Sequence, residues 1–209
     1  MRIAVVGAHG KSGQAVTAAA RRAGIEVTAI TRRPDSVDAD HQLVRDALEL
    51  TAADLAGFDA VVDALGYWTA ETMHFHKETA EHLVSLLCAT PTRLIIIGGA
   101  GTLFVDPDRQ VRLADTPEFP AEFQAVAQGT AQSLAVVEGA DDVAWTYVSP
   151  AADYRPDGAA TDRWAIGDDH LHTSEAGESV LSYADMGSAV VSELLDAKHV
   201  REHISVYTR

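Results

Sequence analysis

MRIAVVGAHGKSGQAVTAAARRAG (residues 1–24) opens the chain with three successive patterns. RIAVV is a short, β-branched apolar run that predicts a strand ending before Gly7. An alanine-rich pattern with helical spacing covers residues 12–23. The turn GAHGKSG lies between them, and its Gly7, Gly10 and Gly13 stand three residues apart. Strand, glycine turn and helix in this order predict the first unit of a nucleotide-binding α/β fold.

The turn also contains GKS, the end of the phosphate loop of triphosphate-binding enzymes, which raises an alternative. That loop requires a glycine five residues before Gly10, and Val5 occupies this position inside the predicted strand. The interval from Gly7 to Gly10 is also too short to wrap a β-phosphate. We therefore interpret the turn as a dinucleotide site. Gly7 permits the tight turn, Gly10 lets the backbone approach a pyrophosphate, and Gly13 lets the helix pack close to the strand.

Side chains and charge around the turn agree with a phosphate ligand. His9, Lys11 and Ser12 are candidate side-chain donors, and the helix N-terminus adds amide donors and positive potential. Residues 1–33 carry a net charge of +5, whereas the rest of the chain carries −20. The total of −15 argues against nucleic acid as a partner, because that ligand requires a basic face.

The second predicted strand, EVTAIT (residues 26–31), ends in Arg32 and Arg33. A site for NAD places Asp or Glu here to bind the ribose 2′-hydroxyl, whereas a guanidinium suits a 2′-phosphate. The sequence therefore favours NADP(H) over NAD(H). The alternative is that one arginine stacks on adenine or faces solvent. Asp46, after the third predicted strand, is a candidate for adenine contacts or, almost equally, a loop or cap residue.

Strand and helix patterns alternate along the whole chain, which predicts a Rossmann-type, doubly wound parallel sheet with helices on both faces. We expect a single domain over residues 1–209. Residues 150–182 are expected to form much of its substrate side, with RWAIG (163–167) and ESVLS (178–182) as arms of a small hairpin. Residues 101–119 show no clear period. The ligand is expected past the carboxyl ends of the strands, where six loops converge; they begin at Gly7, Thr31, Asp46, Gly66, Gly98 and Pro150.

Helix starts are marked at several places. TAAD (51–54) and SYAD (182–185) have the spacing of capping boxes. A helix is expected from about Ala70 to Cys88, and another opens after Pro120.

Cys88 is the single cysteine, so no intrachain disulfide forms. With no signal peptide and no apolar run long enough to span a bilayer, we expect a soluble cytoplasmic protein that does not bind a membrane.

The chain lacks the Tyr-x-x-x-Lys relay that short-chain dehydrogenases use to move a proton. None of the three lysines has a tyrosine four residues earlier; those positions hold Gly7, Met73 and Leu194. Reduction of a carbonyl to an alcohol requires an acid for the alkoxide as it forms. A flavin or a quinone delocalises the charge that it accepts and takes its proton from water. The protein then needs only to hold two rings face to face.

Five stretches together resemble the atypical short-chain dehydrogenase/reductase family: GAHGKSG, VTAITRRP, RLIIIGGAGTL, WTYVSPAADYRPDG and VLSYADMGSAVVSELL. Within it the chain is most similar to the NAD(P)H-binding NADH-flavin reductases, which are related to biliverdin/flavin reductases and NmrA-like proteins. The resemblance covers nearly the whole chain. It departs at His9, where a threonine is usual, and over residues 157–175. The second departure leaves the substrate open.

The resemblance implies roles for particular residues. Arg32 would bind the 2′-phosphate, and Leu65 and Gly66 would line the cofactor. Pro150 and Ala151 would contact the nicotinamide side. The pyrophosphate would be held by Gly7, Gly10, Lys11, Ser12 and Gly13.

These observations favour an NADPH-dependent oxidoreductase that passes a hydride to a flavin, a quinone or a similar flat small-molecule acceptor. A flavin would then be a substrate rather than a prosthetic group. Two alternatives stay open. One is a non-catalytic NADP(H) sensor of NmrA-like type that binds a partner protein. The other is an isomerase or dehydratase on the same scaffold, although the sequence names no acid or base for it.

Aromatic residues near the strand ends are candidates for contact with the acceptor. Tyr67 and Trp68 follow the fourth predicted strand, where they can stack on a flat ring or pack under the long loop. Further candidates are Thr102, the only hydroxyl at the end of the fifth strand, Phe104 and Tyr154. No metal site is expected. His170 and His172 lie near two acids, but no third ligand has metal-site spacing, which favours a solvated loop.

Overall fold

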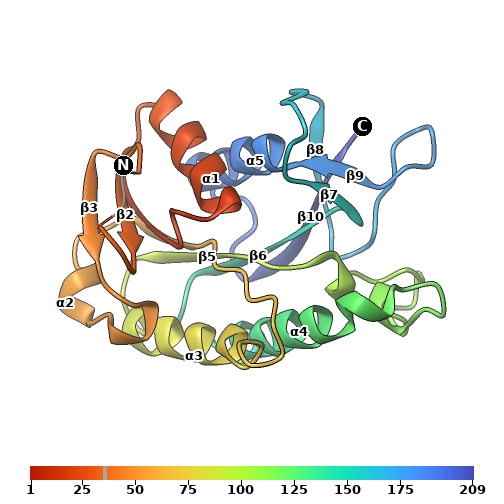
Figure 1. The fold of residues 1–209 in the computed structure, drawn as a ribbon, viewed down its shortest axis with the longest axis horizontal. Helices are drawn as coiled ribbons and strands as arrows, with labels where there is room; N and C mark the ends of the chain where they lie inside the picture. The colour runs from red at the N-terminus through yellow and green to blue at the C-terminus, as the bar shows by residue number, and fades with distance from the viewer. Residues whose placement is uncertain (35–36) are drawn as a thin grey trace.

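The computed structural model describes residues 1–34 and 37–209 (Figure 1). Its main sheet consists of β1 (Arg2–Val6), β2 (Glu26–Thr31), β3 (His41–Val44), β4 (Ala60–Asp63), β5 (Arg93–Ile97), β6 (Trp145–Pro150), β8 (Trp164–Gly167) and β10 (Glu202–Thr208). In the described part of the chain these eight strands run in the order β3-β2-β1-β4-β5-β6-β10-β8. All neighbours are parallel except β8, which runs antiparallel to β10.

Helices cover both faces of the sheet. Figure 1 shows one pair packed on one face and a second pair on the other. The first pair is α1 (Lys11–Arg22) with α5 (Tyr183–Asp196), the second is α3 (Phe75–Leu87) with α4 (Gln124–Glu138), and a short α2 (Ala52–Leu55) lies near β3. The prediction of a Rossmann-type doubly wound fold is confirmed.

The sheet separates two hydrophobic cores because successive side chains of a strand point to opposite faces. On β1, Ile3 and Val5 belong to the core that contains residues of α1 and α5, whereas Ala4 and Val6 belong to the core under α3 and α4. All four side chains are buried. A strand buried on both faces must be apolar at nearly every position, which explains the continuous run RIAVV.

Two predicted helix caps are present, but only the first forms both hydrogen bonds of a capping box. At α2, the Thr51 side chain and Asp54 form the complete capping box. At α5, the Ser182 hydroxyl accepts the backbone N–H of Asp185, 3.0 Å away. The buried Asp185 carboxylate accepts instead from the backbone N–H and hydroxyl of Thr161. Asp185 therefore ties the loop before β8 to the first turn of α5.

The predicted hairpin between residues 163–167 and 178–182 is wrong. Both segments are strands, but β8 pairs with β10, and β9 (Val180–Ser182) pairs in parallel with β7 (Asp153–Arg155). A three-residue strand offers little pairing to a hairpin partner, and isolated two-stranded ribbons are marginal. The longer β10, paired with β6 on its other side, offers four paired positions to β8, which becomes the edge strand. The sequence pattern found the strands and missed their partners.

Two further differences concern segment ends. Helix α3 begins at Phe75 rather than near Ala70, because a turn bonded from Thr72 N–H to the Thr69 carbonyl precedes it. Short 3-10 turns at Ala100–Thr102 and Leu113–Asp115 interrupt the segment that showed no period in the sequence.

Across the described residues, none of the helices combines the length and the apolar character that crossing a membrane would require.

Candidate functional site

The glycine turn joins β1 to α1 at the carboxyl edge of the sheet. Gly7 has a φ of +77°, which L side chains rarely adopt, and its carbonyl accepts the N–H of Gly10 at 2.9 Å. A Cβ on Gly13 would overlap the Gly7 carbonyl and lie 2.7 Å from the Cα of Ala8. Gly10 is the N-cap of α1, and no side chain caps this helix end. The turn therefore presents backbone amides and positive potential to an anion.

A cavity of about 430 Å³ lies on one side of this turn, and we call it the arginine cavity. Its walls include Arg32, Arg33 and Arg45, beside Asp46. The remaining lining residues are Val6, Gly7, His9, Gly10, Ile30, Thr31, Ala47, Leu48, Ala64, Leu65, Gly66, Tyr67 and Phe75. Arginine residues in the wall of a small cavity are typical of a site for a phosphate monoester.

The charged residues of the arginine cavity differ in whether they already form ion pairs or hydrogen bonds with other residues. Arg45 donates to the Asp54 carboxylate at 2.8 Å and is half-buried. Asp46 caps the short turn Ala47–Glu49 by accepting the Leu48 N–H at 3.0 Å, so it is both a cap and a wall residue. Arg32 is exposed, and among the described residues it has no ion-pair partner. Arg32 is thus the guanidinium most available to a ligand.

A second cavity, of about 940 Å³, lies on the other side of the turn, and we call it the aromatic cavity. Its rings come from Tyr67, Trp68, Phe119, Phe123, Tyr154 and Tyr183, together with His76. The rest of its wall is formed by Gly10, Lys11, Ser12, Ala64, Leu65, Gly66, Ile97, Gly98, Gly99, Ala100, Gly101, Leu113, Thr116, Glu118, Pro120, Val126, Ala127, Thr130, Pro150, Ala151, Ala152, Asp153, Pro156 and Ser179. The two cavities share Gly10 and residues 64–67. A ligand crossing the turn can therefore occupy both.

The segment after β4 is held by two residues near the start of α3. The Tyr67 hydroxyl lies 3.1 Å from the Thr79 hydroxyl, and its ring meets the His76 ring edge-on at 5.1 Å. His76 Nε2 donates to the Tyr67 carbonyl at 3.2 Å, and burial lowers the pKa of this imidazole. Trp68 is 64% exposed, and its indole lies over Gly66. Tyr67 is therefore fixed, whereas Trp68 forms an open rim.

The segment after β6 touches the glycine turn. The Tyr154 hydroxyl lies 3.3 Å from the Ser12 hydroxyl, and the Tyr154 ring stacks on Tyr183 at 3.8 Å. Lys11 Nζ lies 3.3 Å from the Asp157 carboxylate. Burial raises the pKa of the Tyr154 phenol far above neutrality, so this hydroxyl keeps its proton. The phosphate turn and the substrate side are thus in direct contact.

A buried carboxylate supports the loop that the two cavities share. Asp63, the last residue of β4, is 6% exposed and accepts the Leu65 N–H at 3.0 Å. Burial raises the pKa of Asp63 to about 6. Because this value lies above the ordinary one near 3.8, the folded chain holds the proton more tightly than the unfolded chain does. Stability from this group is full below pH 3.8 and is lost as the pH rises through 6.

We expect Asp63→Asn to stabilise the protein at pH 7 and not at pH 4. The shift corresponds to at most about 3 kcal/mol, and because a buried amide also loses hydration we expect about 1–2 kcal/mol. Urea unfolding of both proteins at pH 4, 5, 6 and 7 measures the difference in the free energy of unfolding. That difference should grow between pH 4 and 6 and then level off. A difference independent of pH would contradict the assignment.

The structure places two predicted acceptor residues away from the aromatic cavity. Thr102 is fully buried, and its hydroxyl lies 2.8 Å from the Ser149 hydroxyl and 3.3 Å from His203 Nε2. Phe104 lies under the Arg112 guanidinium, 4.9 Å from it, and beside His170. Neither lines the cavity. The long loop folds back on itself here, so proximity to the end of β5 in sequence did not place these side chains at the cavity.

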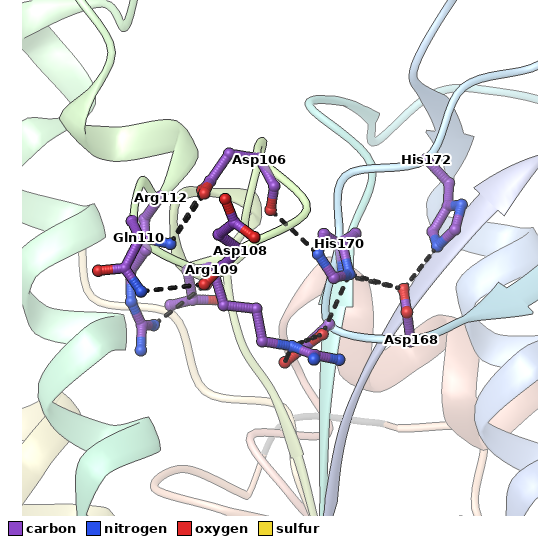
Figure 2. A network of polar contacts seen from close by, with 10 residues as sticks. Asp106, Asp108, Arg109, Gln110, Arg112, Asp168, His170 and His172 are labelled. Atoms are coloured by element: carbon purple, nitrogen blue, oxygen red, sulfur yellow. Dashed lines mark hydrogen bonds and ion pairs between the residues drawn. The ribbon is translucent and has the colours of Figure 1, made fainter.

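Figure 2 shows the polar network that joins residues 106–112 to residues 168–172. Arg109 Nε donates to both carboxylate oxygens of Asp169, and His170 lies between Asp168 and Asp169 at 3.2 Å from each. His172 Nε2 lies 2.9 Å from Asp168. The ligand atoms of Asp168, Asp169 and His170 lie within 4.8 Å of one another. The network pins the long loop to the edge of the sheet, and the absence of a metal here stays a prediction.

The residues present fit a dinucleotide. Helix α1 begins with no side-chain cap at Gly10, which lines both cavities, and the arginines line only one of the two. Gly7, Gly10, Lys11 and Ser12 border the place where a pyrophosphate would lie. Gly13 does not line either cavity; it permits the close packing of α1 on the turn. Leu65, Gly66, Gly98, Pro150 and Ala151 all line the aromatic cavity, on the side where a nicotinamide would lie.

The fold and this site define a class: Rossmann-type proteins that bind a nicotinamide dinucleotide. A family model described as NAD(P)H-binding matches residues 7–198. The chain belongs to this NAD(P)H-binding family, in the group of NmrA-like and atypical short-chain dehydrogenase/reductase proteins.

Several relatives match along their whole length. The uncharacterized protein YwnB of Bacillus subtilis (strain 168) is 40% identical over 209 residues, which is 99% of this chain and 98% of YwnB. SP1627 of Streptococcus pneumoniae TIGR4, named a putative NADH-flavin reductase, is 39% identical with a TM-score of 0.98, and 100% of each chain is covered. A protein from Lactobacillus casei is 33% identical with a TM-score of 0.91, covering 100% of this chain and 99% of that one.

Sequence reasoning missed several wall residues. Arg45 directly follows β3 and precedes the predicted Asp46, so the rule of strand carboxyl ends could have found it. His76 and Tyr183 lie in the first turns of helices, and no motif distinguishes them. Phe119 ends the segment without period, and Phe123 lies just after Pro120, in the 3-10 turn that precedes α4. They reach the cavity only because the long loop folds across the end of the sheet.

Proposed function

We propose that the protein is an NADPH-dependent reductase that transfers a hydride to a flat aromatic acceptor, a flavin or a quinone, bound as a substrate. The observation that carries this proposal is the pairing of two cavities across one glycine turn. One contains three arginines, and the other is lined with rings and apolar groups. The bound dinucleotide supplies the hydride.

Binding of the cofactor would be divided among three groups of residues. The turn amides and Ser12 would hold the pyrophosphate, and Lys11 would add a positive charge. Arg32 would bind the 2′-phosphate, with Arg33 and Arg45 raising the local potential. Such a division would favour NADP(H) over NAD(H), because the cations would lie beside the 2′-phosphate that only NADP(H) carries.

Positioning of the acceptor would be the main catalytic contribution of the aromatic cavity. Tyr67 is fixed by Thr79 and His76, so its ring offers a rigid wall, and burial raises the pKa of its phenol to about 12. Neither this phenol nor that of Tyr154 acts as a base at neutral pH. With no Tyr-x-x-x-Lys pair in the chain, an acceptor that delocalises its new charge suits these residues better than a simple ketone.

Purified protein is expected to oxidise NADPH when riboflavin or a soluble naphthoquinone is supplied without oxygen. Turnover on the order of 1 s⁻¹ or faster would place it with ordinary enzymes. Absorbance of the reduced nicotinamide measures the rate, and reactions without protein give the background. If both acceptors stay at the background rate while NADPH binds tightly, the reductase proposal fails and a sensor role gains support.

A further inference from the structure

We infer that the preferred acceptor is an uncharged ring system, riboflavin-like or quinone-like, rather than a phosphorylated flavin, and that Glu118 sets this preference. The inference rests on the proposed function, because it specifies the acceptor for that reaction. It follows from the distribution of charge between the two cavities.

Cations lie almost entirely on the side of the arginine cavity. Three arginines line that cavity, whereas the described lining of the aromatic cavity has Lys11 as its one cation and no arginine. Lys11 belongs to the glycine turn and is already paired with Asp157. A phosphate on the acceptor would therefore find no guanidinium in this wall. Phosphate recognition in proteins relies on such donors, so a phosphorylated acceptor gains nothing from its phosphate here.

Acidic residues in the aromatic cavity act against a phosphorylated acceptor. Glu118 and Asp153 both line the aromatic cavity. Asp153 is neutralised by a close ion pair with Arg155. Glu118 is exposed and, within residues 1–34 and 37–209, has no ion-pair or hydrogen-bond partner. This carboxylate is thus an unpaired acid in the cavity wall, where it would repel an anionic substituent.

The ring end of the acceptor meets favourable surfaces instead. Trp68 and Phe123 are 64% and 46% exposed, and both line the cavity. Phe119 is partly buried beside them. Exposed aromatic rings at a cavity rim gain contact area when a flat ring covers them. The cavity therefore rewards an aromatic ring and penalises a dianionic phosphate.

The ratio of kcat/KM for riboflavin to kcat/KM for FMN tests this inference. In the wild type we expect riboflavin to be favoured about fivefold, from one carboxylate and a dianion roughly 8 Å apart in water. Glu118→Lys should reverse the ratio to favour FMN about fivefold. Glu122→Lys carries the same charge change on a neighbouring exposed residue outside the cavity lining, and it should leave the ratio within twofold of wild type. Raising the ionic strength should bring the wild-type ratio toward one.

Equilibrium binding of both flavins to the NADP⁺-loaded protein, followed by flavin fluorescence, separates the two proposals. Binding with the expected preference but no reduction overturns the reductase proposal and supports the charge preference. Reduction of FMN as fast as riboflavin, or a ratio that Glu118→Lys does not change, overturns the charge preference and leaves the reductase proposal standing. If neither flavin binds or is reduced, both are overturned.

Discussion

Gly13→Ala is expected to weaken the binding of NADPH and of NADH alike by about 100-fold or more. A Cβ at this position would overlap the Gly7 carbonyl, and every near neighbour is backbone of the turn itself. No flexible side chain can move aside, so either the turn opens or α1 shifts away from β1. Overpacking of this kind also costs about 1–3 kcal/mol of stability. Cofactor titration and urea unfolding measure the two effects.

Gly139→Ala serves as the matched control for that substitution. Gly139 follows α4 with a φ of −86°, and a Cβ there would have its nearest neighbour at ordinary contact distance, 3.6 Å. This variant should bind both cofactors as the wild type does. If Gly13→Ala bound them within threefold of the wild type, the turn would not be the pyrophosphate site.

Arg32→Glu is expected to weaken NADPH by about 100-fold to 1000-fold and NADH by less than about threefold. Removal of a charge-assisted hydrogen bond costs about 1.5–3 kcal/mol, and the new carboxylate adds repulsion to the 2′-phosphate. NADH has a hydroxyl at that position, so it neither loses the charge-assisted hydrogen bond nor meets the repulsion. Dissociation constants for both cofactors, measured at one fixed ionic strength, give the selectivity directly.

Arg22→Glu is the control for the charge change. Arg22 is an exposed residue in the last turn of α1 and lines neither cavity. Its substitution changes the net charge by the same amount and should shift NADPH binding by less than about threefold. Equal losses for NADPH and NADH in Arg32→Glu would refute the 2′-phosphate role, and Arg45 would then become the candidate to test.

Much of this fold could be predicted because its first unit has strong local signals. Strand β1 is apolar at every buried position, and α1 begins at the expected glycine turn. The pairing partners of β8 and of β9, which are β10 and β7, could not be predicted. Each is a run of three or four residues whose partner is distant in sequence, so the pattern shows that a strand forms without showing what it pairs with.

The residues of the candidate site also include some that the sequence could predict and some that it could not. Residues at or shortly after the end of a strand, such as Pro150 in β6 and Gly66 after β4, lie at the expected edge because parallel strands bring their carboxyl ends together. Thr102 and Phe104 also follow a strand, yet one is buried in a hydroxyl cluster and the other packs on Arg112. Long-loop side chains depend on tertiary contacts such as those with Asp169 and His170, and no local pattern encodes these.

If the proposed cofactor and acceptor both bind, the contacts of Lys11 with Asp157 and of Ser12 with Tyr154 would couple their two sites. A pyrophosphate that draws Lys11 and Ser12 toward itself competes with Asp157 and Tyr154 for the same donors. Tyr154 belongs to the wall of the aromatic cavity, so a filled turn would change the contacts of that wall. Thermodynamic reciprocity then requires each ligand to change the affinity of the other by an equal factor. Under this scheme a filled glycine turn and a filled aromatic cavity would alter each other's affinity, whichever ligand binds first.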